Sequence, residues 1–159
     1  NSMCYLPVKV KVIDQRLLDE NVGWGLPSYG TPGSAGLDLR ACIEEPLVLE
    51  PDSKSVLVSS GLSIYLEDPN YVGLLYPRSG TGHKLGIVLG NLTGVIDSDY
   101  QGPLMMSVWN RSKETVTIQP GDRIAQYVVV PVQRIELQVV DSFEETERGV
   151  GGFGHTGTK

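Results

Sequence analysis

Glycine and proline interrupt this chain every several residues, and that spacing restricts its fold more than any other feature. The 159 residues include 19 Gly and 10 Pro, a density that leaves little room for long helices. Between the interruptions lie short runs of β-forming residues, and Val8 to Val12 alternate like a strand with one buried face. Many short strands at close spacing predict an all-β sandwich or barrel.

The gaps between the predicted strands almost all contain Gly, Pro, Asp, Asn or Ser. One short helix is predicted to begin at Ser79 and end near Lys84, because Pro77 and the neighbouring glycines prevent a longer one. After the strand at 8–12, we predict strands at residues 47–49, 55–58, 62–65, 72–76, 87–89, 104–109, 116–118, 124–130 and 135–140.

Length and charge limit the function classes that remain. The length suits one domain with a real core. A net charge of -6 without a run of Lys or Arg argues against nucleic-acid binding, although a small phosphorylated ligand needs only a few arginines and amides. Two cysteines make no disulfide framework, and no stretch has the length of a membrane span or the pattern of a signal sequence. We therefore expect a cytoplasmic protein that contacts no membrane.

Residues 90–102 carry the most distinctive chemistry. An apolar run leads into a turn that contains Asp97, Asp99 and Tyr100, with glycines spaced through it. This turn chemistry predicts a β-hairpin with acids at its tip. With Asn91, the segment offers an amide to read a base, an acid to activate water and an aromatic ring to stack on a sugar. A hairpin with a merely solvated acidic turn is the alternative.

Four further segments accompany this one, at residues 35–41, 77–82, 121–126 and 148–157. In this order, the five segments resemble the five motifs of the trimeric deoxyuridine triphosphate nucleotidohydrolases, or dUTPases, and look most similar to the bacterial members. The resemblance implies a distorted jelly-roll sandwich with one short helix, assembled as a homotrimer with shared active sites. It also implies hydrolysis of dUTP to dUMP and pyrophosphate, which limits uracil in DNA and supplies dUMP for thymidylate synthesis.

For the nucleoside end of the substrate, the resemblance assigns roles to several residues of segment 90–102. Asp97 matches the base that orients and deprotonates the water attacking the α-phosphorus. Asp99 competes for that role but is interpreted as a structural residue of the turn. Tyr100 matches the tyrosine that packs under the deoxyribose. The residues that match the uracil-binding surface and its surroundings are Asn91, Gly94, Val95, Ile96 and Met105.

For the phosphate end, the resemblance assigns catalytic contacts to Arg78 and Gln126. Ser79 and Gly80 begin the predicted helix, where backbone amides and the helix dipole favour phosphate oxygens. Asp38 matches the carboxylate that supports a hydrated Mg²⁺ ion, which substrate phosphates mainly hold. Arg123 is interpreted as structural.

The C-terminal residues 142–159 are predicted to form a flexible, glycine-rich lid. By resemblance, this tail closes over the bound nucleotide, whereas a disordered terminus is the alternative. Residues 8–141 would form the β domain, and residues 1–7 an N-terminal segment in which Asn1-Ser2 looks like a cloning remnant. The tail residues expected to contact substrate are Arg148, Phe153, Gly154, His155 and Thr156.

Two other functions are compatible with the same fold. One is a dCTP deaminase, although the segment from Gly94 to Tyr100 follows the hydrolase pattern. The other is a non-catalytic member that binds nucleotide or a protein partner. The loop at residues 21–28, which contains Trp24, matches no family motif and gives no functional prediction.

Overall fold

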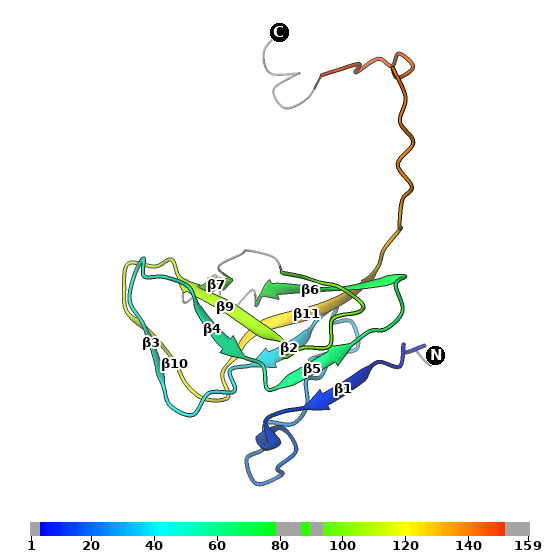
Figure 1. The fold of residues 1–159 in the computed structure, drawn as a ribbon. Helices are drawn as coiled ribbons and strands as arrows, with labels where there is room; N and C mark the ends of the chain where they lie inside the picture. The colour runs from blue at the N-terminus through cyan, green and yellow to red at the C-terminus, as the bar shows by residue number, and fades with distance from the viewer. Residues whose placement is uncertain (1–3, 79–86, 90–93, 152–159) are drawn as a thin grey trace.

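The computed structural model describes residues 4–78, 87–89 and 94–151, and the regular secondary structure of this part is almost entirely β-strand (Figure 1). The all-β class predicted from the glycine and proline spacing is therefore confirmed. The only helical segment in the described ranges is one turn of 3-10 helix, η1 (Gln15–Leu17). The strands are β1 (Lys9–Val12), β2 (Leu37–Arg40), β3 (Leu47–Leu49), β4 (Val56–Ser59), β5 (Leu62–Tyr65), β6 (Tyr71–Pro77), β7 (Ile87–Leu89), β8 (Gly94–Ile96), β9 (Met105–Asn110), β10 (Val116–Ile118) and β11 (Arg123–Pro131).

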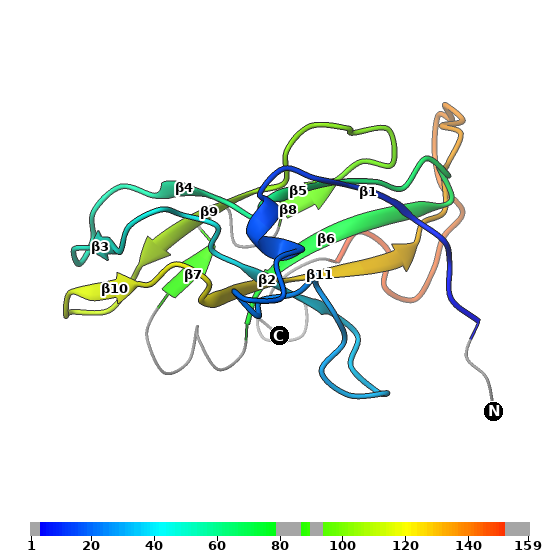
Figure 2. The ribbon, with the colours of Figure 1, turned by 90° about the horizontal axis from the view of Figure 1, so that it is seen from below.

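The strands form four antiparallel groups around one hydrophobic core (Figures 1 and 2). The largest group has the order β2-β11-β6-β8, and a second has the order β4-β9-β7. Two pairs, β1-β5 and β3-β10, complete the body. Alternating residues of these strands point inward, and the largest fully buried ones include Leu39, Leu49, Leu62, Met106, Val108 and Tyr127.

Segment 90–102 does not form the predicted hairpin across its acidic turn. β8 pairs with β6, with Ile96 opposite Gly73, whereas β9 pairs with β4 and β7. The turn after β8 therefore connects two different sheets. The same turn residues suit a hairpin and a link between two sheets. The partner strand is chosen by distant parts of the chain, so the local sequence could not distinguish these two connections.

The strand predicted at residues 135–140 is also wrong. After β11 the chain leaves the body as an extended segment (Figure 1), and residues 132–150 are exposed and contain no strand. We call residues 132–147 the C-terminal arm. Ile135, Leu137 and Val139 have the alternation of a strand, but they are 77%, 85% and 98% exposed. An apolar stripe needs a partner surface, and the described part of this chain does not supply one for the arm.

Two other sequence predictions concern a short helix and membrane spans. The short helix expected from Ser79 to Lys84 lies outside the described residues. Within the described ranges, the structure contains no helix long and apolar enough to cross a bilayer.

Candidate active site

A cavity of about 230 Å³ opens at the end of β8, where the chain turns towards β9. Five of its seven lining residues are site residues predicted from the sequence. The lining consists of Val95, Ile96, Asp97, Tyr100, Pro103, Leu104 and Met105. The turn that follows β8 thus brings an acid, an aromatic ring and apolar side chains around one space.

The acid and the ring of this cavity are held by the turn itself. The backbone N–H of Tyr100 donates to the carbonyl of Asp97 at 3.2 Å, and the Tyr100 hydroxyl donates to the carbonyl of Pro103 at 2.7 Å. The Asp97 side chain is exposed, so water reaches its carboxylate. Asp99 is exposed as well, but it is not among the described residues that line the cavity.

A second group of predicted site residues meets across three neighbouring strands. Gln126 of β11 lies opposite Asp38 of β2 on one side and Tyr76 of β6 on the other. The Gln126 amide donates to the carbonyl of Pro77 at 3.2 Å. Arg78 follows Pro77 and donates from Nε to Asp38 Oδ1 at 3.2 Å. Asp38, Arg78 and Gln126 are therefore tied into one polar cluster.

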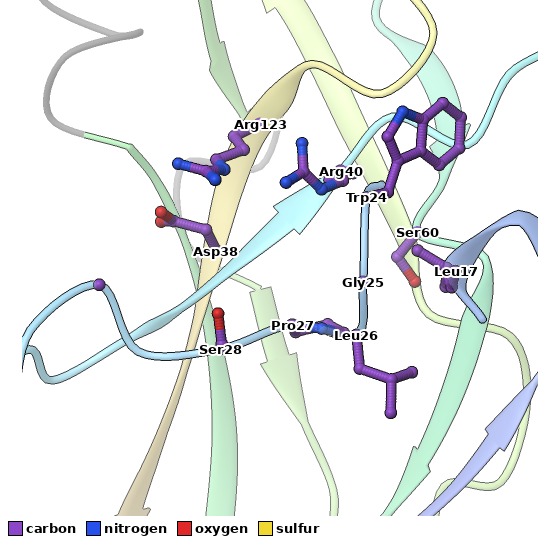
Figure 3. A pocket seen from close by; sticks show the side chains of 11 residues that line it. Leu17, Trp24, Gly25, Leu26, Pro27, Ser28, Asp38, Arg40, Ser60 and Arg123 are labelled. Atoms are coloured by element: carbon purple, nitrogen blue, oxygen red, sulfur yellow. The ribbon is translucent and has the colours of Figure 1, made fainter. Parts of the chain in front are cut away.

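Two more arginines lie beside this cluster. Asp38, Arg40 and Arg123 project from β2 and β11 into a pocket whose other wall is the loop at residues 24–28 (Figure 3). Burial, together with the nearby charge of Arg123, lowers the pKa of the Arg40 guanidinium from its ordinary value. Arg78 also donates to the carbonyl of Arg123 at 3.2 Å. Three arginines around one aspartate leave an excess of positive charge, which suits an anionic ligand.

The structure explains the loop that the sequence left without a role. The Arg16 guanidinium lies over the Trp24 ring, 4.7 Å from its centroid, and Asp14 binds the same guanidinium at 2.6 Å. The indole also lies directly against Gly121, where a Cβ would collide with Trp24 Nε1. These contacts fix the loop as one wall of the arginine pocket. Sequence patterns contain no local signal for that role.

Arg40 was also missed, although a signal existed. It stands two positions after Asp38 in β2, and alternate residues of a strand point to the same face.

The remaining predicted site residues lie elsewhere or outside the described ranges. The predicted residue Gly94 is buried in β8, opposite Leu75. Arg148 lies in an exposed turn, where its Nε donates to the carbonyl of Gly151 at 2.6 Å. The predicted site residues that lie outside the described ranges are Ser79, Gly80, Asn91, Phe153, Gly154, His155 and Thr156.

The cavity at Asp97 and the cluster at Asp38 are far apart in one chain. Ile96 pairs with Gly73 near one end of β6, and Asp97 lies beyond that level. Arg78 follows Pro77 at the opposite end of β6. At about 3.3 Å per residue, the two ends are separated by about 20 Å. A single chain therefore keeps the two groups of predicted site residues apart.

Comparisons with known proteins give one consistent family. The model of the dUTPase family matches residues 23–157. A deoxyuridine 5'-triphosphate nucleotidohydrolase from Acinetobacter baylyi is 59% identical over 154 residues, which cover 97% of this chain and all of that protein. Another protein of that name, from Polynucleobacter asymbioticus, is 57% identical over 150 residues, covering 94% of this chain and 97% of the relative.

A solved structure agrees with these relatives. The dUTPase of Staphylococcus bacteriophage 80alpha with dUPNHPP superposes with a TM-score of 0.78 at 29% identity, over 94% of this chain and 97% of the phage chain. The family and the jelly-roll fold predicted from the five motifs are confirmed, since matches of this extent do not arise from one shared segment. This chain belongs to the dUTPase family.

Proposed function

We propose that this chain hydrolyses dUTP to dUMP and pyrophosphate by attack of water on the α-phosphorus. The observation that carries the proposal is the cavity at the end of β8, where Asp97, Tyr100 and Met105 lie around one space. The exposed Asp97 carboxylate takes a proton from the water while the water oxygen bonds to the α-phosphorus. The bond from that phosphorus to the α,β-bridging oxygen breaks, and pyrophosphate leaves with the electron pair.

The cavity has the parts that a deoxyuridine needs. Tyr100 presents a ring on which the sugar packs, and the edge of β8 presents backbone groups to the base. A fixed backbone N–H or carbonyl distinguishes uracil from cytosine, whereas an amide side chain such as Asn91 can flip to suit either. Gly94, Val95 and Ile96 supply that backbone, and Met105 lies beside it.

The arginine-rich cluster suits the triphosphate. Arg78 and Gln126, with Arg40 beside them, offer donors to phosphate oxygens. Placed donors that stabilise the charge developing on the phosphates contribute more to the rate than a base alone. By resemblance, Ser79 and Gly80 add contacts near Arg78. The tail adds Arg148, Phe153, Gly154, His155 and Thr156.

The residues present also fit a magnesium ion. Asp38 is the only carboxylate lining the arginine pocket in the described ranges, and its side chain is 28% exposed. No group of three His, Cys, Asp or Glu side chains that could hold a metal occurs in the described part of the chain. One carboxylate acting through water suits Mg²⁺, which keeps several waters and is bound largely by substrate phosphates. When bound, the ion would neutralise phosphate charge.

We infer that the working unit is a homotrimer, because one chain separates the two parts of the site. The C-terminal arm supports assembly with other copies, because its Ile135, Leu137 and Val139 side chains are exposed in the single chain. Burying each such side chain against another copy is worth about 1.5–3 kcal/mol. An arm that reaches a neighbouring copy can also deliver the tail to the neighbour's nucleotide.

Pyrophosphate release from dUTP, dTTP, dCTP and UTP, each with and without Mg²⁺, tests the proposed reaction. We expect release from dUTP at a rate far above the other three, with Mg²⁺ raising that rate. Ammonia release from dCTP without pyrophosphate from dUTP would instead indicate the deaminase alternative. Tight dUTP binding without turnover would indicate a non-catalytic member.

Gly36, which lies against Gln126, gives a sharper test of the role of Gln126 in the polar cluster. A Cβ at Gly36 would lie 2.5 Å from Gln126 Oε1 and 3.2 Å from Gln126 Cβ, so Gly36→Ala must shift the Gln126 side chain, and we expect this shift to disturb its hydrogen bond to the Pro77 carbonyl. Because small misplacements near the reacting groups are costly, we expect kcat for dUTP to fall by about tenfold or more. Steady-state kinetics and thermal unfolding measure this.

Gly33→Ala is the matched control, since it changes a glycine of the same loop at which an added methyl group would have no other atom within 4 Å. Its kcat should equal that of the unchanged protein. Equal rates for Gly36→Ala and Gly33→Ala would contradict the positioning of Gln126 by Gly36.

A further inference from the structure

We propose that Gly102 is a specificity-determining positioning residue, because its missing side chain lets the Tyr100 ring lie where it can reject ribose. The inference rests on the proposed function, in which the ring packs under a deoxyribose. Gly102 is not among the described residues that line the cavity at the end of β8.

The Tyr100 ring lies directly against Gly102. A Cβ built on Gly102 would be 2.5 Å from Tyr100 Oη, 2.7 Å from Cζ and 3.0 Å from Cε1. Ordinary carbon contacts are about 3.5–4.0 Å, so a methyl group there would displace the ring by about 1 Å. Glycine is thus the residue that allows this close approach.

Backbone conformation does not explain this glycine. Gly61 and Gly121 have φ angles of +80° and +88° and occupy the left-handed region, where other residues are strained. Gly102 is not among the glycines with a positive φ. An alanine at position 102 is therefore compatible with the backbone, and the Tyr100 ring is what it would disturb.

The same displacement removes the hydrogen bond that fixes the ring. The Tyr100 hydroxyl donates to the Pro103 carbonyl at 2.7 Å, so the ring is held between that carbonyl and Gly102. The Tyr100 side chain is nevertheless accessible from the cavity, and the residue is 42% exposed. A ring fixed before the substrate binds excludes a 2′-hydroxyl by its position, whereas a released ring can move aside.

The test compares kcat/KM for UTP and dUTP in Gly102→Ala, Tyr100→Ala and the double variant. We expect Gly102→Ala to raise the UTP-to-dUTP ratio by about tenfold, the size of effect that one small group produces in a pocket. Tyr100→Ala should raise the ratio as well. The double variant should equal Tyr100→Ala, because a methyl group at position 102 then has no ring to displace.

Controls separate this mechanism from a general loss of structure. Gly33→Ala adds the same methyl group where it meets nothing within 4 Å, and it should leave the ratio unchanged. An unchanged ratio in Gly102→Ala, with UTP and dUTP turnover reduced equally, would overturn the inference. A UTP-to-dUTP ratio in the double variant that differs from the ratio in Tyr100→Ala would also overturn it.

Folding of the variants gives a second readout. Should Gly102→Ala fail to fold, the double variant decides the point: it supports the inference if it folds and overturns it if it does not. Failure of the proposed function is distinguishable, since the unchanged protein would then release no pyrophosphate from dUTP. Failure of the inference alone leaves an active dUTP-selective protein whose Gly102→Ala variant is equally selective.

Discussion

Replacing Asp97 with asparagine is expected to lower the turnover of dUTP by about 10²- to 10⁴-fold, which is the contribution of a positioned general base. Asparagine has nearly the same shape as aspartate but cannot accept the proton of the attacking water. The Asp97 side chain is exposed at the end of β8, and surface substitutions of this kind change stability by less than about 0.5 kcal/mol. Fold and nucleotide binding should therefore be retained.

Asp99→Asn is the matched control for this experiment. Asp99 lies two residues further along the same turn and is similarly exposed, so its substitution removes an equal charge from the same surface. Single-turnover pyrophosphate release and dUTP binding should be measured for both variants. Turnover of Asp97→Asn close to that of the unchanged protein, or an equal loss in Asp99→Asn, would show that Asp97 is not the base.

Deleting residues 148–159 is expected to reduce dUTP hydrolysis by about 10²-fold or more while leaving the proposed trimer intact. The deletion removes Arg148 and the tail donors proposed for the phosphates, and loss of one such donor set is costly in the transition state. It leaves the C-terminal arm with Ile135, Leu137 and Val139 in place. Light scattering after size exclusion, with pyrophosphate release on the same sample, measures both properties.

A longer deletion, of residues 132–159, is the informative comparison. It removes the whole arm from Val132 onward, including the backbone contact in which the Val132 N–H donates to the Asn70 carbonyl at 2.8 Å and ties the arm to the body. We expect this variant to lose assembly as well as activity. Full activity after the shorter deletion would refute the role of the tail, and a stable trimer after the longer one would refute that of the arm.

The described strands show which part of the fold local patterns could predict. Residues 47–49, 62–65 and 116–118 were predicted as strands and form β3, β5 and β10 with the same bounds. Period-two alternation and turn residues are local properties, so they can be recognised without knowing the partner strand. The arm carries the same pattern at residues 135–140, yet it forms no strand because no partner strand pairs with it within the described part of the chain.

The candidate site divides in the same way. Asp97, Tyr100 and Met105 were expected together, and the short path from β8 to β9 brings them around one cavity. Arg40 and the loop of Trp24 were not expected beside Asp38, since the contacts that hold the loop join Arg16 and Gly121 to the indole. The contact between Trp24 and Gly121 links residues about 100 positions apart in the sequence, where no local spacing rule applies.

The sequence by itself determined the all-β class, the family and the types of residue at the proposed site, because turn chemistry and motif spacing are written in consecutive residues. Only the tertiary structure decided that β8 pairs with β6, that the Tyr100 ring lies against Gly102, and that Asp97, which follows β8, and Arg78, which follows β6, lie towards opposite ends of β6. The physical reason is that strand pairing and side-chain contact depend on which distant surfaces can be buried together.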